Sequence, residues 1–238
     1  MNKKRLLESI KKELEWLADV EYKKGAKNFF KEKVVMMGVR VPNRRKVAKK
    51  YFGVMKNWSK SEIFEISEEL MELQIGEYRT IVFEWVFRIK DRFEKKDFER
   101  WEKWIKKYVS NWGACDDFCT HTVGYFLARF PQFLPRLKMW AKSKNRWFRR
   151  AASVSLIYPV RREKKYLDEV FEIADILLTD SDDLVQKGYG WMLKEASNVY
   201  AKKVMDFVMK RKDKMPRTAL RYAIEKMPEE WKRKAMKR

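Results

Sequence analysis

Apolar residues recur at helical spacing along most of the chain. In the first segment they are Leu6, Ile10, Leu14 and Leu17, which are three or four residues apart and so share one face of a helix. The same spacing occurs in two further segments, at Ile63, Ile66, Leu70 and Leu73, and at Ile81, Trp85 and Ile89. No long alternating run indicates a strand. The pattern predicts an all-α fold of about a dozen helices joined by short loops.

Glycine and proline separate these patterns and do not interrupt them. They fall at positions where helix ends or first turns are expected: Gly25, Gly38–Pro42, Gly53, Gly76, Pro131–Pro135, Pro159 and Pro216. Ser59 and Glu62 have the spacing of a capping box, in which each residue bonds to the other's backbone. This pair predicts a helix that begins directly after Ser59.

Three helix openings in the second half resemble one another. They start near residues 145, 181 and 216, which are 36 and 35 residues apart, close to the period of helix-pair repeats. Stacked pairs form a curved solenoid with a concave face. Arg150, Lys187 and Arg217 follow these openings and are expected to form one row of cations. We therefore predict a single domain over residues 1–238, built from antiparallel HEAT-like helix pairs with a concave basic groove.

The charge balance points to a polyanionic partner. With 56 Lys and Arg against 34 Asp and Glu, the net charge is +22, and 45% of the residues are hydrophobic, which is enough for a folded core. Nucleic acid is the first candidate, because binding phosphates releases condensed counterions. An anionic membrane surface and a lysine-rich surface of a heat-adapted protein are the alternatives. The longest stretch without a formal charge, residues 118–128, is too short to cross a membrane.

Compartment and cofactor can also be addressed from the sequence. The N-terminus lacks an apolar signal core and the two cysteines form no disulfide framework, so we expect a cytoplasmic, nucleoid-associated protein. Cys115, Cys119 and His121 are potential metal ligands, but their spacing is not that of a zinc site, and buried thiols are the default. No dinucleotide-binding or P-loop glycine pattern occurs. We expect neither a metal nor a cofactor.

Four stretches of the sequence resemble the AlkD-like family of DNA alkylation-repair proteins, which are built from HEAT-like repeats. They follow the family's motifs Gly-x-x-x-Pro-x-x-Arg, Trp-x-x-x-Asp, Trp-x-x-Arg-Ala-Ala and Gln-Lys-x-x-Gly-Trp-x-Leu-[Arg/Lys]-Glu. In this chain the motifs run over residues 38–45, 112–116, 147–152 and 186–195. Four motifs in the same order and with similar spacing make a specific signal. Departures are Gly113, Cys115 and a second acid, Asp117, around the motif's Asp.

The resemblance implies a monofunctional DNA glycosylase of base-excision repair. Members release cationic alkylated purines, chiefly 3-methyladenine and 7-methylguanine, from double-stranded DNA. By the resemblance, Asp116, Trp112 and Trp191 would surround the reacting deoxyribose and Arg150 would contact phosphate. The residues expected to bind DNA are Arg150, Arg149, Lys187, Arg45, Arg44 and Arg217. A monomer suits a groove that wraps a duplex, and no lysine is placed for an associated lyase step.

These residue types suit the departure of a base that already carries a positive charge. Such a base leaves as a neutral molecule, so no acid has to protonate it, and the positive sugar becomes the group that needs stabilisation. A fixed carboxylate does this and can orient the attacking water, while indole faces add attraction for a cation. Trp112 and Asp116 are four residues apart and share a face if the helix includes both.

Two other functions remain open at the level of sequence. The first is a non-catalytic helical-repeat protein that binds damaged or branched DNA. The second is a solenoid that binds RNA or protein. For single residues, Trp112 and Trp191 could be core tryptophans, Asp116 could be an acid at a helix start, and Arg150 could be one solvated base among many.

Overall fold

Helices form all the regular structure in the computed structural model, which describes residues 2–237. No strand occurs among these residues, so the predicted all-α class is confirmed. None of the helices in this range has the length and apolar content needed to cross a membrane. The chain divides into two compact units, Met1–Asp117 and Phe118–Arg238. We describe each unit separately, and the single domain over 1–238 stays a prediction.

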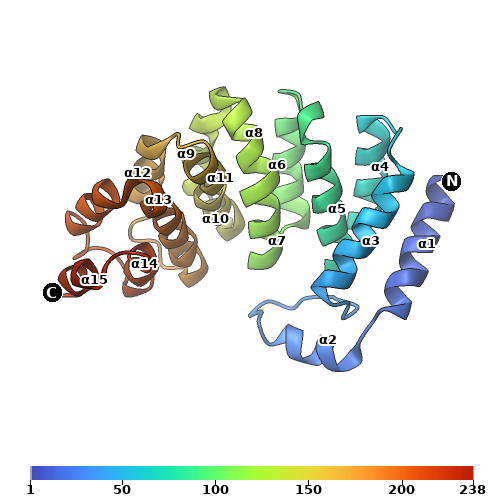
Figure 1. The fold of residues 1–238 in the computed structure, drawn as a ribbon, viewed down its shortest axis with the longest axis horizontal. Coiled ribbons are helices and arrows are strands. Elements are labelled where there is room, and N and C mark those ends of the chain that lie inside the picture. Colours follow the sequence, from blue (N-terminus) through green and yellow to red (C-terminus); the bar gives the residue numbers. More distant parts are fainter. Residues whose placement is uncertain (1, 238) are drawn as a thin grey trace. The chain divides into compact units, whose positions relative to one another are not determined.

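The first unit holds seven α-helices within its described residues. They are α1 (Lys3–Trp16), α2 (Val20–Lys27), α3 (Val41–Val54), α4 (Lys60–Glu72), α5 (Gly76–Arg88), α6 (Asp97–Tyr108) and α7 (Trp112–Asp117), with a 3₁₀ turn, η1, at Lys90–Arg92. Figure 1 shows α1, α3 and α5 side by side, and helix contacts join α1 to α3, α3 to α5 and α5 to α7. A long loop, residues 28–40, connects α2 to α3.

The apolar faces predicted from the sequence form the core of this unit. Leu6, Ile10 and Leu14 are fully buried on α1, as is Trp85 on α5, whose indole Nε1 donates to the carbonyl oxygen of Ala48 at 2.8 Å. The capping box of Ser59 and Glu62 is present at the start of α4. One expectation was wrong: Leu73 follows the end of α4 and is 53% exposed, because the chain turns there and leaves the buried face.

The second unit begins with a π-helical segment, η2 (Phe118–Val123). It continues with α8 (Gly124–Arg129), a 3₁₀ turn η3 (Pro131–Phe133), α9 (Leu134–Ala141), α10 (Arg146–Val154), α11 (Ile157–Arg162), α12 (Leu167–Ile176), α13 (Asp183–Met209), α14 (Arg217–Ala223) and α15 (Glu229–Met236). The three similar openings of the sequence are the starts of α10, α13 and α14. Helix α13, brown in Figure 1, packs against α10, α11, α12 and α14 and is the centre of this unit.

Candidate active site

Helix α7 carries the first two candidate residues of the catalytic group. Asn111 is 5% exposed and caps the helix: its side-chain oxygen accepts the backbone N–H of Ala114 at 2.9 Å. Because the helix starts at Trp112, the indole and the carboxyl group of Asp116 are four residues apart within it and share one face. Both residues are half-buried. The condition set by the sequence, that the helix includes both residues, is met.

The ring of Trp112 is held by a segment that is distant in sequence. Its Nε1 donates a hydrogen bond of 3.2 Å to the carbonyl oxygen of Phe29, and its ring stacks on Phe30 with centroids 5.4 Å apart and planes 24° apart. The loop 28–40 therefore fixes the indole of Trp112, which shares a face of α7 with Asp116. Phe29 and Phe30 could not be found from the sequence, since more than eighty residues separate them from Trp112 and no spacing connects the two segments.

Trp191 lies on α13, in the second unit, and is tied to a nearly buried acid. Its Nε1 donates to Oε1 of Glu195 at 3.1 Å, and Glu195 is 8% exposed. The other carboxylate oxygen, Oε2, contacts Nη1 of Arg161 at 3.0 Å and accepts from Asn198 at 3.2 Å. Glu195 is the last residue of the fourth motif, and its i+4 spacing from Trp191 was the signal that could have assigned it a role.

Neither tryptophan of the candidate site belongs to the core. Trp85, Trp101 and Trp104 are almost fully buried, whereas Trp112 and Trp191 are each half-buried, so part of each indole is accessible. Partial exposure is what a residue needs if its ring is to contact a ligand. The interpretation of these two residues as core tryptophans is therefore wrong.

Arg150 is a buried cation between two helices of the second unit. It is 5% exposed, and Nη1 donates to the carbonyl oxygen of Leu184 on α13. Gly188 leaves room for the Arg150 side chain between α10 and α13, because a Cβ atom at position 188 would lie only 3.2 Å from Cγ of Arg150. The interpretation of Arg150 as a solvated base is wrong, and its contact with phosphate stays a prediction. The expected row of exposed cations is also wrong, because Arg150 turns into the contact between α10 and α13.

Arg149 is held by the loop that precedes α13. Its Nε donates to Oδ2 of Asp180 at 2.7 Å, and Nη1 donates to the carbonyl oxygens of Ser143 and Lys144 at 3.0 and 3.1 Å. Several of its donors are thus used within the protein. This arrangement connects the start of α10 to the turn before α13, and a DNA contact of Arg149 stays a prediction.

Lys187 shares a face of α13 with Trp191, one turn before it. Its Nζ lies 3.2 Å from Oδ2 of Asp183, and both side chains are partly exposed. Arg217 is exposed at the first position of α14, and its Nη1 donates to the carbonyl oxygen of Met236 at 3.4 Å. In the second unit, α13 thus brings Lys187, Trp191 and Glu195 together, with Arg150 packed against the same helix.

The remaining two candidates lie on α3 of the first unit. Arg45 is exposed, and half-buried Arg44 donates from Nη1 to Oγ1 of Thr80 on α5 at 3.2 Å. The first residue of the early motif, Gly38, has a φ of +99° and lies near the end of the loop before α3. The motif thus forms a turn that leads into a basic helix. DNA binding by both arginines stays a prediction.

Both cysteines are buried free thiols, as expected from their place on a helix face. Within residues 2–237, no group of three or more His, Cys, Asp and Glu side chains is arranged to hold a metal ion.

Comparison with known proteins gives the family. The sequence model of a family described as DNA alkylation repair enzyme matches residues 10–227. Among solved structures, a predicted DNA alkylation repair enzyme from Enterococcus faecalis is similar with a TM-score of 0.79 at 18% identity, covering 89% of this chain and 97% of that one. The Pseudomonas fluorescens alkylpurine DNA glycosylase AlkC, bound to DNA containing an abasic site analog, has a TM-score of 0.48 at 17% identity, covering 94% of this chain and 62% of that one. No curated protein matches the sequence. Because the family match extends over most of its length, the chain belongs to the DNA alkylation repair enzyme family.

Proposed function

We propose that the protein is a monofunctional DNA glycosylase that hydrolyses the N-glycosidic bond of cationic alkylated purines, such as 3-methyladenine and 7-methylguanine, in duplex DNA. The observation that carries the proposal is the pairing of Trp112 and Asp116 on one face of α7, with the indole held by Phe29 and Phe30. A fixed indole on the same helix face as a carboxyl group is suited to a positively charged sugar. Net charge supports DNA as the partner.

The reaction balances without a cofactor. The bond between C1′ and the purine nitrogen breaks, and its electron pair neutralises the charge on the base, which departs uncharged. Asp116 stabilises the positive sugar and orients a water molecule, whose oxygen bonds to C1′. The proton released by that water passes to Asp116 or to solvent. The products are a free base and an abasic site, with no strand cleavage.

The roles of Trp191, Arg150 and Arg45 rest on the resemblance to the AlkD-like family. It assigns Trp191 to the same deoxyribose as Asp116, and Arg150 to phosphate. Arg149, Lys187, Arg44, Arg45 and Arg217 would bind the strands on either side of the lesion. In this proposal selectivity comes from the charge of the leaving base and not from a shaped base pocket. The protein would act as a monomer on cytoplasmic, nucleoid-associated DNA.

Release of 7-methylguanine from methylated duplex DNA tests the proposal. We expect the wild-type protein to release the base and leave an abasic site, and Asp116→Asn to release it far more slowly with unchanged DNA affinity. Asp117→Asn is the matched control, because it changes a neighbouring carboxylate and the same amount of charge. Equal release by wild type and Asp116→Asn would remove Asp116 from the mechanism.

The same assay separates catalysis from binding alone. A wild-type protein that binds duplex DNA in a salt-dependent manner but releases no base would overturn the glycosylase proposal in favour of a non-catalytic DNA-binding protein. RNA binding without affinity for duplex DNA would overturn both the glycosylase proposal and the alternative of a non-catalytic DNA-binding protein.

A further inference from the structure

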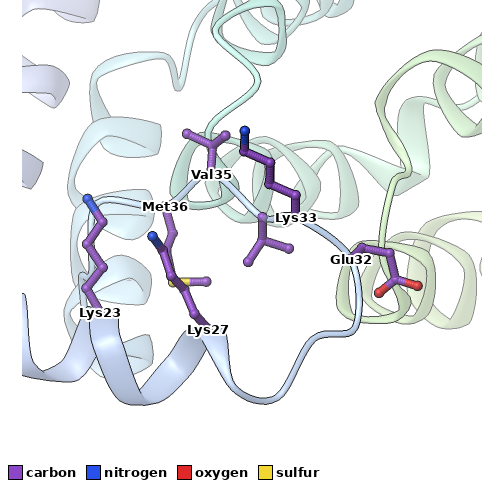
Figure 2. A pocket seen from close by; sticks show the side chains of 7 residues that line it. Lys23, Lys27, Glu32, Lys33, Val35 and Met36 are labelled. Atoms are coloured by element: carbon purple, nitrogen blue, oxygen red, sulfur yellow. The ribbon is translucent and has the colours of Figure 1, made fainter.

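A pocket of about 260 Å³ lies between α2 and the loop that follows it, in the first unit. It is lined by Lys23, Lys27, Glu32, Lys33, Val34, Val35 and Met36. Figure 2 shows Lys23 and Lys27 projecting from α2 toward the segment 33–36, with Glu32 at the opposite end of the pocket from Lys23. None of these residues belongs to the motifs that carry the family resemblance.

The three lysines of the pocket differ in their surroundings from the lysines of the same unit that are held in ion pairs. Lys50 pairs with Glu13 at 2.5 Å and Lys60 with Asp97 at 2.8 Å. Among the described residues, by contrast, the ammonium groups of Lys23, Lys27 and Lys33 have no ion pair or hydrogen bond. Glu32 is the acidic residue of the pocket lining, so three lysines against one glutamate leave the lining with a net charge of +2, which favours an anion. Residues 20–36 contain five lysines and two glutamates, a net charge of +3.

The pocket is a fixed part of the fold, because its walls are tied to helices α2, α5 and α7. The carbonyl oxygen of Val35 accepts the backbone N–H of Gly76 at 2.9 Å. Buried Glu77 accepts the backbone N–H groups of Met37, Gly38 and Val39 at 2.9 to 3.1 Å. Such multiple hydrogen bonds to one carboxylate are strong and directional.

The same loop also reaches the candidate catalytic helix. Phe29 and Phe30, which hold the ring of Trp112, are separated by a single residue from the pocket-lining residues Glu32 and Lys33. A ligand in the pocket is therefore connected to α7 through a few residues of one anchored loop. The pocket lining combines the apolar residues Val34, Val35 and Met36 with the three lysines and Glu32. This combination fits a phosphate group joined to a deoxyribose.

We propose that this pocket binds the sugar-phosphate backbone of duplex DNA, with Lys23, Lys27 and Lys33 contacting phosphate and Val35 and Met36 contacting the sugar. The inference rests on the proposed function in that it takes DNA as the substrate, but it concerns binding and not base release. It adds a DNA contact outside the recognised motifs, on the loop that supports Trp112.

The test compares two triple variants with the same loss of charge. Lys23→Gln/Lys27→Gln/Lys33→Gln removes the pocket cations, and Lys12→Gln/Lys56→Gln/Lys95→Gln removes three exposed lysines elsewhere in the first unit. Affinity for an unmodified duplex is measured between about 50 and 200 mM salt. We expect the slope of log K against log salt to fall by about one for each pocket lysine that contacts phosphate, and to change little in the control.

An arginine variant should restore DNA binding, and two results would contradict the proposal. Lys23→Arg/Lys27→Arg/Lys33→Arg keeps the charge and should keep the wild-type slope. Equal slopes in the pocket and control variants would overturn the proposal. Tight binding of inorganic phosphate alone, at constant ionic strength and lost in the pocket variant, with no change in the DNA slope, would assign the pocket to a free phosphate compound and overturn the DNA assignment.

This experiment is separate from the base-release assay. If the protein releases 7-methylguanine while its pocket variant binds DNA like the control variant, DNA binding by the pocket is refuted and the glycosylase proposal stands. If the wild-type protein releases no base but the salt dependence of DNA binding falls in the pocket variant, the glycosylase proposal is refuted and DNA binding by the pocket stands.

Discussion

The indole Nε1 of Trp191 donates a hydrogen bond of 3.1 Å to Oε1 of Glu195, one turn further along α13. Glu195 is almost buried, and Arg161 and Asn198 contact its second oxygen. The carboxylate thus connects the ring to α11 and to the next turn of α13. Because a half-buried indole has several rotamers open to it, this bond selects the orientation of the ring.

Replacing Glu195 should therefore slow base release by loosening Trp191. For Glu195→Ala we expect a release rate about tenfold lower, equivalent to 1.4 kcal/mol, together with a lower Tm because the Nε1 donor and Arg161 lose their partner. Glu195→Gln keeps an acceptor for Nε1 and should restore most of the rate. Single-turnover release of 7-methylguanine, measured well below the Tm, gives the rate.

Glu225→Ala is the control for this change, since Glu225 is an exposed glutamate of the same unit that pairs with Lys194 at 3.1 Å. It should leave the rate unchanged. If Glu195→Ala lowers the Tm but releases the base at the wild-type rate, Glu195 is structural only and does not position Trp191.

Gly38 should tolerate no side chain. Its φ is +99°, and a Cβ atom would lie 2.5 Å from the carbonyl oxygen of Asp19 and 2.7 Å from Cβ of Lys23. We expect Gly38→Ala to lower the free energy of unfolding by about 1–3 kcal/mol or more, from backbone strain and the clash with α2. The measurement is urea unfolding of the variant beside the wild type.

Gly25→Ala provides the matched comparison, because Gly25 lies within α2 and a Cβ atom there meets nothing within 4 Å. This variant should be about 0.5–1 kcal/mol more stable, since alanine loses less conformational freedom than glycine in a helix. Equal destabilisation by both substitutions would contradict the account of Gly38.

The start of α2 should depend on pH through Asp19. The Tyr22 backbone N–H, which Asp19 accepts at 2.8 Å, and the Arg40 guanidinium lower the pKa of this carboxyl group below its usual value. Because the folded-state pKa is lowered, its stabilisation is complete above the ordinary pKa of about 3.9 and is lost as the pH falls through the folded value.

The chemical shift of the Tyr22 amide proton reports this titration directly. Its midpoint should lie below the usual value for an aspartate in wild-type protein and move upward in Arg40→Gln, which removes the guanidinium bonded to Asp19 at 2.8 Å. A wild-type midpoint at or above the ordinary value would refute the assignment of Asp19 as an ionised cap.

The helices were predictable because local patterns determine them. The spacing of Leu6, Ile10 and Leu14 identified a buried face, and Ser59 with Glu62 identified a helix start, since both signals involve residues within one or two turns. The prediction that Leu73 is buried was wrong because the apolar pattern continues beyond the end of α4. The sequence does not reveal where a chain turns away from its own core.

Much of the candidate site depends on contacts that no local pattern encodes. Trp112 and Asp116 could be paired from their spacing, but the support from Phe30 arises only in the fold. The motif singled out Arg150, but no local pattern indicated that its side chain is buried beside Gly188. The lysines of the pocket cannot be singled out by sequence in a chain with 56 basic residues, because what distinguishes them is that the fold gathers them around one hollow.

The burial of both thiols bears on the conditions in which such a protein works. Electrophiles that methylate purines also attack thiolates, and an exposed cysteine is their first protein target. Cys115 and Cys119, the chain's two cysteines, are fully buried, so the folded molecule offers such reagents no sulfhydryl group. Both sulfhydryl groups of the protein would thus be shielded during the same exposure that alkylates DNA.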